Sequence, residues 1–205
     1  MATIPLSILF HPPLMSKVIM NHGAGGELMQ EFLGKHITSH FPKMKAEVPL
    51  DSMDDSAVVD DVVFTIDGHT VKPLFFPGGD IGKISVSGTV NDISVMGAAP
   101  IGLACSVIIE EGLDIEIVDK VMDSMGQTAA GCGVPIVTGD TKVVEKGRGD
   151  GLYINTSGIG YRKYWLSGLA AVKPGDAVLV SGTVGDHGTA VMLARSGMMD
   201  GDLQS

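Results

Sequence analysis

Aspartates at the ends of predicted strands and helices are the side chains best suited to chemistry in this sequence. They stand beside glycine or other small residues, at Asp51, Asp54, Asp55, Asp67, Asp80, Asp92 and Asp140. Carboxylate oxygens are hard ligands for Mg²⁺, and Mg²⁺ in turn bridges the phosphates of a nucleotide. Any one of these aspartates, taken alone, is more typical of a solvated surface position. Their recurrence at loop ends predicts a site where several carboxylates hold magnesium against phosphates.

A glycine-rich loop at residues 21–27 offers a second way to bind phosphate. Its residues, Asn-His-Gly-Ala-Gly-Gly-Glu, run into a predicted helix, and free backbone N–H groups at a helix start attract anions. The loop lacks the Lys-Ser/Thr pair of a P-loop, and no convincing strand precedes it as a dinucleotide fingerprint requires. A glycine turn that only caps the helix explains the loop equally well.

Lysine and histidine side chains lie near these motifs. Lys142 follows Gly139-Asp140-Thr141 directly and either faces a phosphate near the metal or is an exposed lysine. His22, His69 and His187 are each predicted in a polar loop flanked by glycine, where most histidines are ordinary surface residues. No Gly-x-Ser-x-Gly segment occurs, so a serine-hydrolase elbow is not indicated.

The composition argues against some classes of partner. Lys and Arg number 14 against 24 Asp and Glu, a net charge of −10, which disfavours non-specific binding to nucleic acid or anionic membranes. No apolar run reaches the length of about 20 residues that a membrane-spanning helix needs. Cys105 and Cys132 stand in apolar surroundings without metal-ligand spacing. They are predicted to be buried thiols in a reducing cytoplasm.

Hydrophobic periodicity predicts the elements that must position these residues. In chain order they are a helix over 27–40, a hairpin of strands 57–59 and 62–66 around an Asp60-Asp61 turn, a helix over 81–96 capped by Asp80, a strand over 101–110, a helix from 114 to about 131, a strand over 134–138 with 139–142 as its exit loop, and a strand over 152–161. This order predicts an α+β fold with a mixed sheet and flanking helices.

Three regions are expected along the chain. Residues 1–16 are predicted to be a loose extension, and residues 17–165 form the main domain. Residues 166–205 contain a turn, a predicted strand at 177–181 and a predicted helix at 189–195. One strand and one helix are too little to bury a core, so this last region is expected to be the truncated start of a second α/β domain.

Four segments resemble one protein family. They are residues 67–82 (DGHTVKPLFFPGGDIG), 88–98 (GTVNDISVMGA), 138–144 (TGDTKVV) and 149–158 (GDGLYINTSG). They are similar to the HypE-type hydrogenase maturation factors, which are carbamoyl dehydratases within the PurM-like superfamily of ATPases related to aminoimidazole ribonucleotide synthetase. The similarity extends over residues 19–197.

This resemblance implies a PurM-like domain whose strands form a shared barrel across a homodimer, with ATP and Mg²⁺ bound beside the barrel. It assigns Mg²⁺ to Asp54, Asp55, Asp67, Asp92 and Asp140, and leaves the choice among Asp54, Asp55 and Asp80 open. It assigns phosphate contacts to Asn91, Thr141 and Lys142, and a mobile loop over the phosphates to Gly23, Gly25 and Gly26. Asn91, Lys142 and His22 are the residues expected to take part in catalysis.

The implied reaction is an ATP-dependent dehydration. ATP phosphorylates the carbamoyl oxygen on a carboxy-terminal cysteine, and elimination of phosphate leaves a thiocyanate that supplies cyanide to the iron of a [NiFe] hydrogenase. The implied partners are the carbamoyltransferase and the iron–cyanide scaffold of the same maturation system. This sequence closes with Gly201-Asp-Leu-Gln-Ser205 and has no such cysteine, so the chain as given is expected not to complete the reaction alone.

Two other functions remain open from the sequence. One is another kinase or synthetase of the superfamily, such as thiamine-monophosphate kinase or selenophosphate synthetase, although no cysteine precedes Cys105 as the latter requires. The other is a non-catalytic dimeric scaffold that holds the maturation partners. Loss of Mg-nucleotide affinity on replacement of Asp92 and Asp140 would separate an ATPase from a scaffold.

Overall fold

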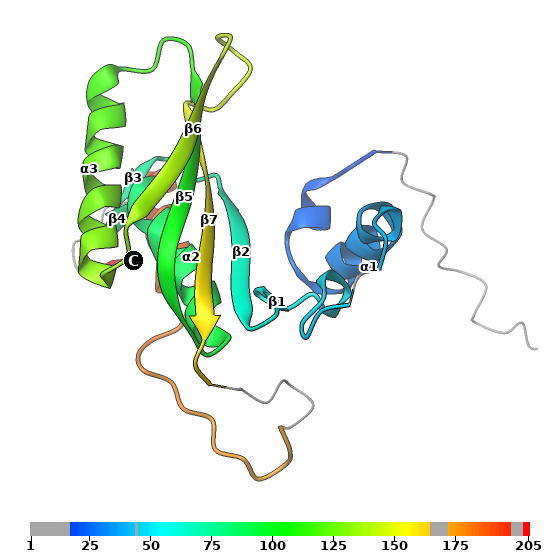
Figure 1. Cartoon of the computed structure of the whole chain (residues 1–205). Coiled ribbons are helices and arrows are strands. Elements are labelled where there is room, and N and C mark those ends of the chain that lie inside the picture. The colour runs from blue at the N-terminus through cyan, green and yellow to red at the C-terminus, as the bar shows by residue number, and fades with distance from the viewer. Residues whose placement is uncertain (1–16, 44, 165–171, 198–202) are drawn as a thin grey trace, which may run out of the picture. The chain divides into compact units, whose positions relative to one another are not determined.

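The computed structural model describes residues 17–43, 45–164, 172–197 and 203–205 (Figure 1). The chain divides into two compact units, Met1–Met44 and Lys45–Ser205. The predicted loose extension at residues 1–16 lies outside the described residues.

The first unit is a short helical segment. A 3₁₀ turn at Met20–Gly23 leads into α1 (Gly26–His36), and a second 3₁₀ turn follows at Thr38–His40. The helix ends at His36, four residues before the predicted residue 40, and the chain continues as the second 3₁₀ turn.

The second unit is built on a mixed five-stranded sheet. Its strands run in the order β1 (Ala57–Val59), β2 (Val62–His69), β7 (Leu152–Arg162), β5 (Ala98–Glu110) and β6 (Ile136–Val144). All neighbours pair antiparallel except β5 and β6, which are parallel and joined by a helix. Two short strands, β3 (Phe75–Phe76) and β4 (Gly79–Asp80), make a separate hairpin. The predicted α+β class is confirmed.

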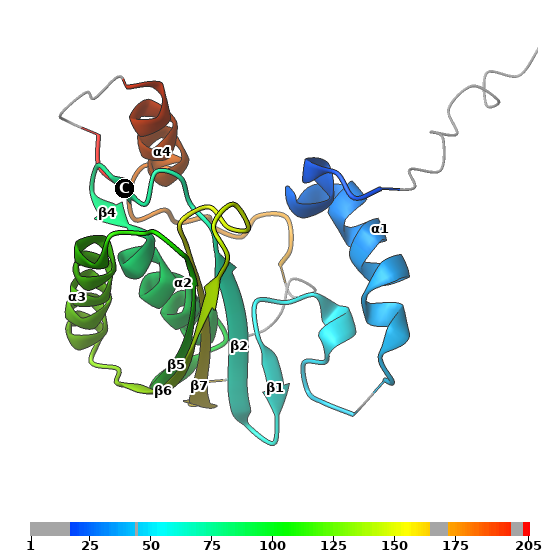
Figure 2. The same cartoon turned by 90° about the horizontal axis from the view of Figure 1, so that it is seen from above.

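Two helices lie on one side of this sheet (Figures 1 and 2). α2 (Ile81–Val95) packs on β2, β7 and β5, and α3 (Ile115–Cys132) packs beside α2. Apolar side chains fill the space between the layers, with Leu103 and Ile154 from the sheet and Val121 from α3 all fully buried. None of the described helices has the length and hydropathy to cross a membrane.

Local signals in the sequence set several of the element ends correctly. Asp60 and Asp61 both adopt positive φ, 50° and 63°, as a two-residue hairpin turn requires. The Asp80 carboxylate accepts hydrogen bonds from the backbone N–H groups of Gly82 and Lys83 at 2.7 and 3.2 Å. The prediction that Asp80 caps the helix is therefore confirmed, and this carboxylate is occupied by α2.

The predicted exit loop at residues 139–142 is wrong. β6 continues through these residues to Val144, in parallel register from Gly139 opposite Cys105 to Val144 opposite Glu110. The polar segment Gly-Asp-Thr-Lys looks like a loop in sequence because β6 is the last strand in the sheet order and eight of its nine residues are exposed. A ladder on one side is enough to hold it as a strand.

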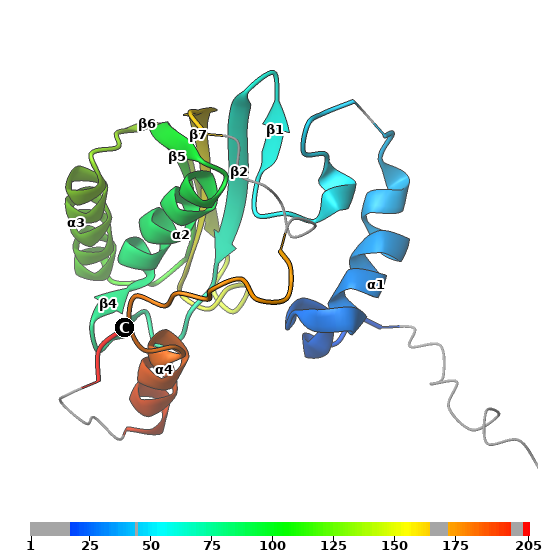
Figure 3. The ribbon, with the colours of Figure 1, turned by 90° about the horizontal axis from the view of Figure 1, so that it is seen from below.

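Two other predictions are wrong: the strand at residues 177–181 and the burial of Cys132. Residues 177–181 form no strand, and Val178 and Leu179 are 94% and 92% exposed. The segment instead leads into α4 (Asp186–Ser196; Figure 3), which contains the predicted helix. α4 packs against β3. Cys105 is buried as predicted, but Cys132 is exposed at the end of α3.

The sheet face opposite the helices carries exposed apolar side chains. Strand alternation turns Val63 toward the helices and its neighbours Phe64 and Ile66 to the other face. Ile159 of β7 stands directly opposite Phe64, and Tyr161 lies two residues further along the same face. These four side chains are 45–73% exposed, and we call them the open sheet face.

Candidate functional site

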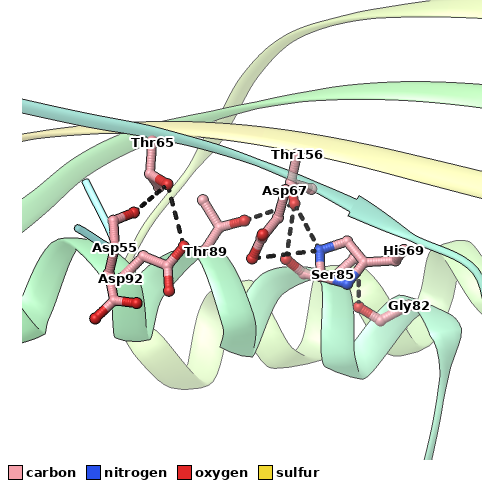
Figure 4. A network of polar contacts seen from close by, with 9 residues as sticks. All are labelled: Asp55, Thr65, Asp67, His69, Gly82, Ser85, Thr89, Asp92 and Thr156. Carbon is pink, nitrogen blue, oxygen red and sulfur yellow. Dashed lines mark hydrogen bonds and ion pairs between the residues drawn. The ribbon is translucent and has the colours of Figure 1, made fainter. Parts of the chain in front are cut away.

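The candidate site lies along the seam between β2 and α2 (Figure 4). Alternation along β2 turns three polar side chains, Thr65, Asp67 and His69, toward the helix. On α2, positions spaced by three and four residues share one side of the helix. Asp92 on this side of α2 contacts Thr65 of β2, while Thr89 and the backbone oxygen of Ser85 contact Thr156 of the neighbouring strand β7. A polar strand face and a polar helix stripe thus meet inside an otherwise apolar layer.

A hydroxyl group links the end of α2 to the hairpin. Thr65 Oγ1 lies 2.9 Å from the backbone oxygen of Asp55 and 3.1 Å from Asp92 Oδ2. Ser56 Oγ donates to the backbone oxygen of Asp92 at 2.8 Å. These bonds place the Asp92 carboxylate next to the chain at Asp55, although 37 positions separate the two residues in the sequence.

The carboxylates in this seam repel one another. The pKa of Asp92 is raised from 3.8 to about 6, first by burial, then by the negative charge of Asp67. The Thr65 hydrogen bond lowers the pKa of Asp92, and the charge of Asp55 raises it further. A divalent cation bound here would relieve this repulsion, and Mg²⁺ typically takes one or two carboxylates together with water and phosphate oxygens.

A buried network fixes the other end of the seam. Thr156 Oγ1 donates to the Ser85 backbone oxygen at 2.9 Å, and lies 2.6 Å from Thr89 Oγ1 and 3.2 Å from His69 Nε2. A hydroxyl has one proton and two lone pairs, so Thr89 and His69 must both donate to Thr156. His69 therefore carries its proton on Nε2. Burial lowers the pKa of His69, against the raising effect of Asp67, which favours the neutral ring.

The structure brings some of the predicted metal ligands together. Asp55, Asp67 and Asp92 meet along the seam closely enough for the first two to raise the pKa of the third. Asp54 is exposed beside them, and its Oδ1 accepts the backbone N–H of Asp55 at 3.0 Å. Within the described ranges, no three His, Cys, Asp or Glu side chains are arranged to hold a metal ion by themselves.

Asp140 does not join this cluster within one chain. Asp67 is in register with Thr156, Cys105 and Gly139 across β7, β5 and β6. Side chains alternate between faces, so Asp140 points to the face opposite Asp67, three strands and about 14 Å away in the plane of the sheet.

The remaining predicted residues on this unit are exposed. Lys142 shares a face with Asp140, and Lys142 Nζ lies 3.5 Å from Asp140 Oδ2, with both side chains more than 60% exposed. Thr141 is exposed between them, and Asn91 is exposed on α2 next to Asp92. Their contacts with nucleotide remain predictions.

The predicted phosphate loop belongs to the first unit. His22 Nδ1 accepts the backbone N–H of Ile19 at 3.1 Å, and its ring stacks on Phe32 with centroids 4.8 Å apart. Gly25 and Gly26 have φ of 81° and 76°, a conformation that glycine adopts without strain. A Cβ at Gly23, Gly25 or Gly26 would meet nothing within 4 Å, so the loop is open around these glycines.

Sequence reasoning missed several polar residues of the seam and misplaced two histidines. His69 is predicted in a loop, but it lies on β2 with its side chain 11% exposed. His187 is predicted in a loop, but it lies on α4. The alternation of Thr65, Asp67 and His69 with apolar neighbours is the signal that would have found the polar strand face. Thr156 has no comparable signal, because its partners come from α2 and β2, which are distant from it in the sequence.

Comparison with known proteins gives this geometry a context. Residues 53–161, more than half of the chain, match the family of AIR synthase related proteins, N-terminal domain. A putative hydrogenase expression/formation protein of Methanocaldococcus jannaschii is 45% identical over 191 residues, which cover 88% of this chain and 56% of that protein. Carbamoyl dehydratase HypE of Escherichia coli is 40% identical over 200 residues, covering 93% of this chain and 59% of that protein.

Solved structures agree with these sequence matches. HypE in a HypE–HypF complex superposes with a TM-score of 0.75 at 47% identity, covering 87% of this chain and 56% of that one. HypE in complex with ATP superposes with a TM-score of 0.68 at 42% identity, covering 92% of this chain and 57% of that one. The chain spans a little over half the length of these relatives. The chain belongs to the AIR synthase related family, and its relatives at 40–45% identity include HypE carbamoyl dehydratases.

Proposed function

We propose that this chain forms the Mg-ATP-binding and dimerising part of a carbamoyl dehydratase of HypE type. The carboxylates of Asp55, Asp67 and Asp92 along the β2–α2 seam carry this proposal, because their mutual repulsion suits a site that a cation completes. A solved relative contains ATP, which supports nucleotide as the ligand. Asn91, Thr141, Lys142 and the glycine loop of residues 23–26, with His22, would contact the phosphates.

The proposed reaction dehydrates a cysteine S-carboxamide to a thiocyanate. ATP transfers its terminal phosphoryl group to the carbamoyl oxygen, and the C–O bond then breaks, so that this oxygen leaves in inorganic phosphate. Loss of both amide protons completes the C≡N group. Bound Mg²⁺ would stabilise the charge on the transferring phosphoryl group. The product supplies cyanide for the iron of a [NiFe] hydrogenase.

The proposed assembly is a homodimer formed through the open sheet face. Phe64, Ile66, Ile159 and Tyr161 expose apolar surface there, and apolar patches of this kind mark interaction sites. Asp140 and Lys142 lie on the same side of the sheet. We therefore expect the second copy of the chain to lie close to these two side chains in the dimer. The carbamoyltransferase and the iron–cyanide scaffold are the proposed further partners. Free Cys105 and Cys132 suit a cytoplasmic site of action.

The proposed domain boundary lies near residue 165, with the main domain at 17–165 and a second α/β domain beginning at 166–205. The apolar side chains of Val178, Leu179 and Val180 support this boundary, because their exposure of 70–94% is typical of a segment that packs within a larger domain.

Calorimetric titration with ATP in the presence of Mg²⁺ tests the site. The wild-type chain should bind, and Asp92→Asn should weaken binding about tenfold or more through loss of a ligand charge. Asp119→Asn, an equal change on the exposed side of α3, is the matched control and should bind as the wild type does. Equal affinity in all three proteins would contradict the proposal.

Chemistry and assembly need separate measurements. An S-carbamoyl cysteine peptide given to the chain with Mg-ATP should lose the mass of one water. A chain that associates with maturation partners but neither binds Mg-ATP nor converts the peptide would be a scaffold. Ile66→Lys on the open sheet face should shift the mass in light scattering from dimer to monomer. Ile115→Lys, equally exposed on α3, should leave the dimer intact.

A further inference from the structure

Gly88 sits on α2 where the helix passes closest to the polar face of β2. A Cβ built at this position would lie 3.2 Å from Asp67 Oδ2 and 3.2 Å from His69 Cε1. Both distances are shorter than ordinary van der Waals contact. The absence of a side chain at Gly88 therefore makes the notch that the Asp67 carboxylate and the His69 ring occupy together.

The two neighbours differ in their freedom to move away. The His69 ring is held by its Nε2 hydrogen bond to Thr156, which is itself bound to Ser85 and Thr89 on α2. The Asp67 carboxylate is held more loosely: Asp67 Oδ2 lies 4.0 Å from His69 Nε2, beyond hydrogen-bond distance, its other partner is the partly buried Asp92 carboxyl group, and its side chain is 38% exposed. A methyl group at position 88 would thus displace Asp67 by a few tenths of an ångström before it displaced His69.

Such a displacement matters at a magnesium site. Mg²⁺ demands near-ideal octahedral geometry with short, narrowly distributed metal–oxygen distances. Residues that orient a ligand without touching the metal typically change metal affinity by 10–100-fold when they are replaced. A shift of a few tenths of an ångström in one carboxylate is large on this scale.

Glycine at this position also works against helix stability. Gly in a helix interior is less favourable than Ala by about 1 kcal/mol. Gly126 in α3 gives the contrast, because a Cβ there would meet nothing within 4 Å. Alanine would favour the helical conformation at both positions, but only at position 88 would its Cβ contact a carboxylate.

We propose that Gly88 is a positioning residue that sets the Asp67 carboxylate for the metal bound at this site. The inference rests on the proposed Mg-nucleotide function and deepens it, because it names a residue without a side chain that acts through Asp67. His69 forms the fixed wall of the notch. α2 therefore contributes to the site in two ways: through the carboxylate of Asp92 and through the absence of a side chain at Gly88.

The test compares Gly88→Ala with the matched control Gly126→Ala in the 205-residue chain. Mn²⁺ serves as a paramagnetic substitute for Mg²⁺, and its binding is followed by electron paramagnetic resonance with and without ATP. Gly88→Ala should weaken Mn²⁺ binding about tenfold while its urea midpoint stays equal to or above that of the wild type. Gly126→Ala should raise the midpoint and leave Mn²⁺ affinity unchanged.

A double-mutant cycle checks that the effect passes through Asp67. In an Asp67→Asn background, Gly88→Ala should cause no further loss of Mn²⁺ affinity, since the displaced ligand is already gone. An equal loss in both backgrounds would overturn the assignment. So would a Gly88→Ala chain that fails to fold, because Gly88 would then be a packing requirement.

The outcome also separates this inference from the function on which it rests. A wild-type chain that binds neither Mn²⁺ nor Mg-ATP would overturn the proposed function and the inference together. A wild-type chain that binds both, with Gly88→Ala binding equally well, would overturn the inference alone.

Discussion

The β2–α2 seam and the exposed strand β6 are the two polar regions of the sheet, and they differ in the contacts that fix their side chains. Along the β2–α2 seam, Asp92 is tied by Thr65 and repelled by Asp67, and the Thr156 hydroxyl is buried with its bonds complete. On β6, Asp140 and Lys142 pair with each other in solvent. Both regions lie in segments that resemble one family. The comparison shows that a single chain preorganises one half of the predicted site and leaves the other half exposed.

The largest difference between the two regions is expected in the free energy of unfolding, when one threonine in each region is replaced by valine. Thr156→Val removes the hydroxyl that Ser85, Thr89 and His69 share, and should lower the free energy of unfolding by about 2–3 kcal/mol, since buried polar groups lose their partner. Thr141→Val on exposed β6 should change the free energy of unfolding by no more than about 0.5 kcal/mol. Urea denaturation of both variants measures the difference, and equal effects would erase the distinction between the regions.

A smaller effect is expected in the pH dependence of stability without metal. Asp92 has a folded-state pKa of about 6, above its ordinary 3.8, so the folded chain holds this proton more tightly than the unfolded chain. The Asp92 contribution to the free energy of unfolding should therefore fall as pH rises from about 4 through about 6, whereas the lowered pKa values of His69 and Glu110 act in the opposite direction. We expect a fall of about 1 kcal/mol, reduced by solvent screening.

Denaturation midpoints across this pH range in EDTA measure that fall. Asp92→Asn should remove this downward contribution and raise stability above pH 7 relative to the wild type. Asp140→Asn is the control from the exposed region and should retain the wild-type slope. If the stability of the wild type relative to Asp92→Asn increased from pH 4 to pH 7, the sign of the Asp92 contribution would be contradicted.

The exposed region gains local order from Glu110, at the end of β5. Its carboxylate accepts the backbone N–H of Gly147 at 2.5 Å and of Gly151 at 3.0 Å, and these bonds lower its pKa. Glu110→Gln should weaken both bonds and speed hydrogen exchange of these amides, with little change in the seam. In the wild type, the protection should be present above the ordinary pKa of 4.5 and be lost as pH falls through the lower folded-state value.

Exchange measured by NMR at several pH values tests this point. The amides of Gly82 and Lys83 at the start of α2 provide the internal control, because they bind Asp80 rather than Glu110. Unchanged exchange at Gly147 and Gly151 in the Glu110→Gln chain would show that another contact holds the loop.

The smallest effect is expected for the exposed ion pair. Asp140→Asn removes the partner of Lys142 and should change the free energy of unfolding by less than about 0.5 kcal/mol, because surface ion pairs gain little over solvation. Any effect of this variant on Mg-ATP affinity would then come from the site. Thermal unfolding in low and high salt measures the stability effect, and a loss of several kcal/mol would mean that the pair is far better shielded than its exposure indicates.

Short-range patterns in the sequence determined the local structure. The Asp60-Asp61 turn, the Asp80 cap and the helices α2 and α3 depend on residues a few positions apart, so they could be predicted from the sequence. Motif resemblance also identified the family. The exact length of β6, in contrast, depends on its ladder with β5. Residues 177–181 pair with no strand among the described residues, so the predicted strand does not form there.

Tertiary structure alone decided which acidic residues meet. Sequence pattern placed Asp67, Asp92 and Asp140 in similar surroundings, at the ends of elements beside small residues. Sheet register then turned Asp67 toward α2 and Asp140 to the opposite face, since a shift of one residue reverses the face of a strand side chain. The notch at Gly88 and the hydrogen bonds shared by Thr156 also depend on tertiary structure. Both require segments that are distant in sequence to approach in space, and no local sequence pattern encodes that approach.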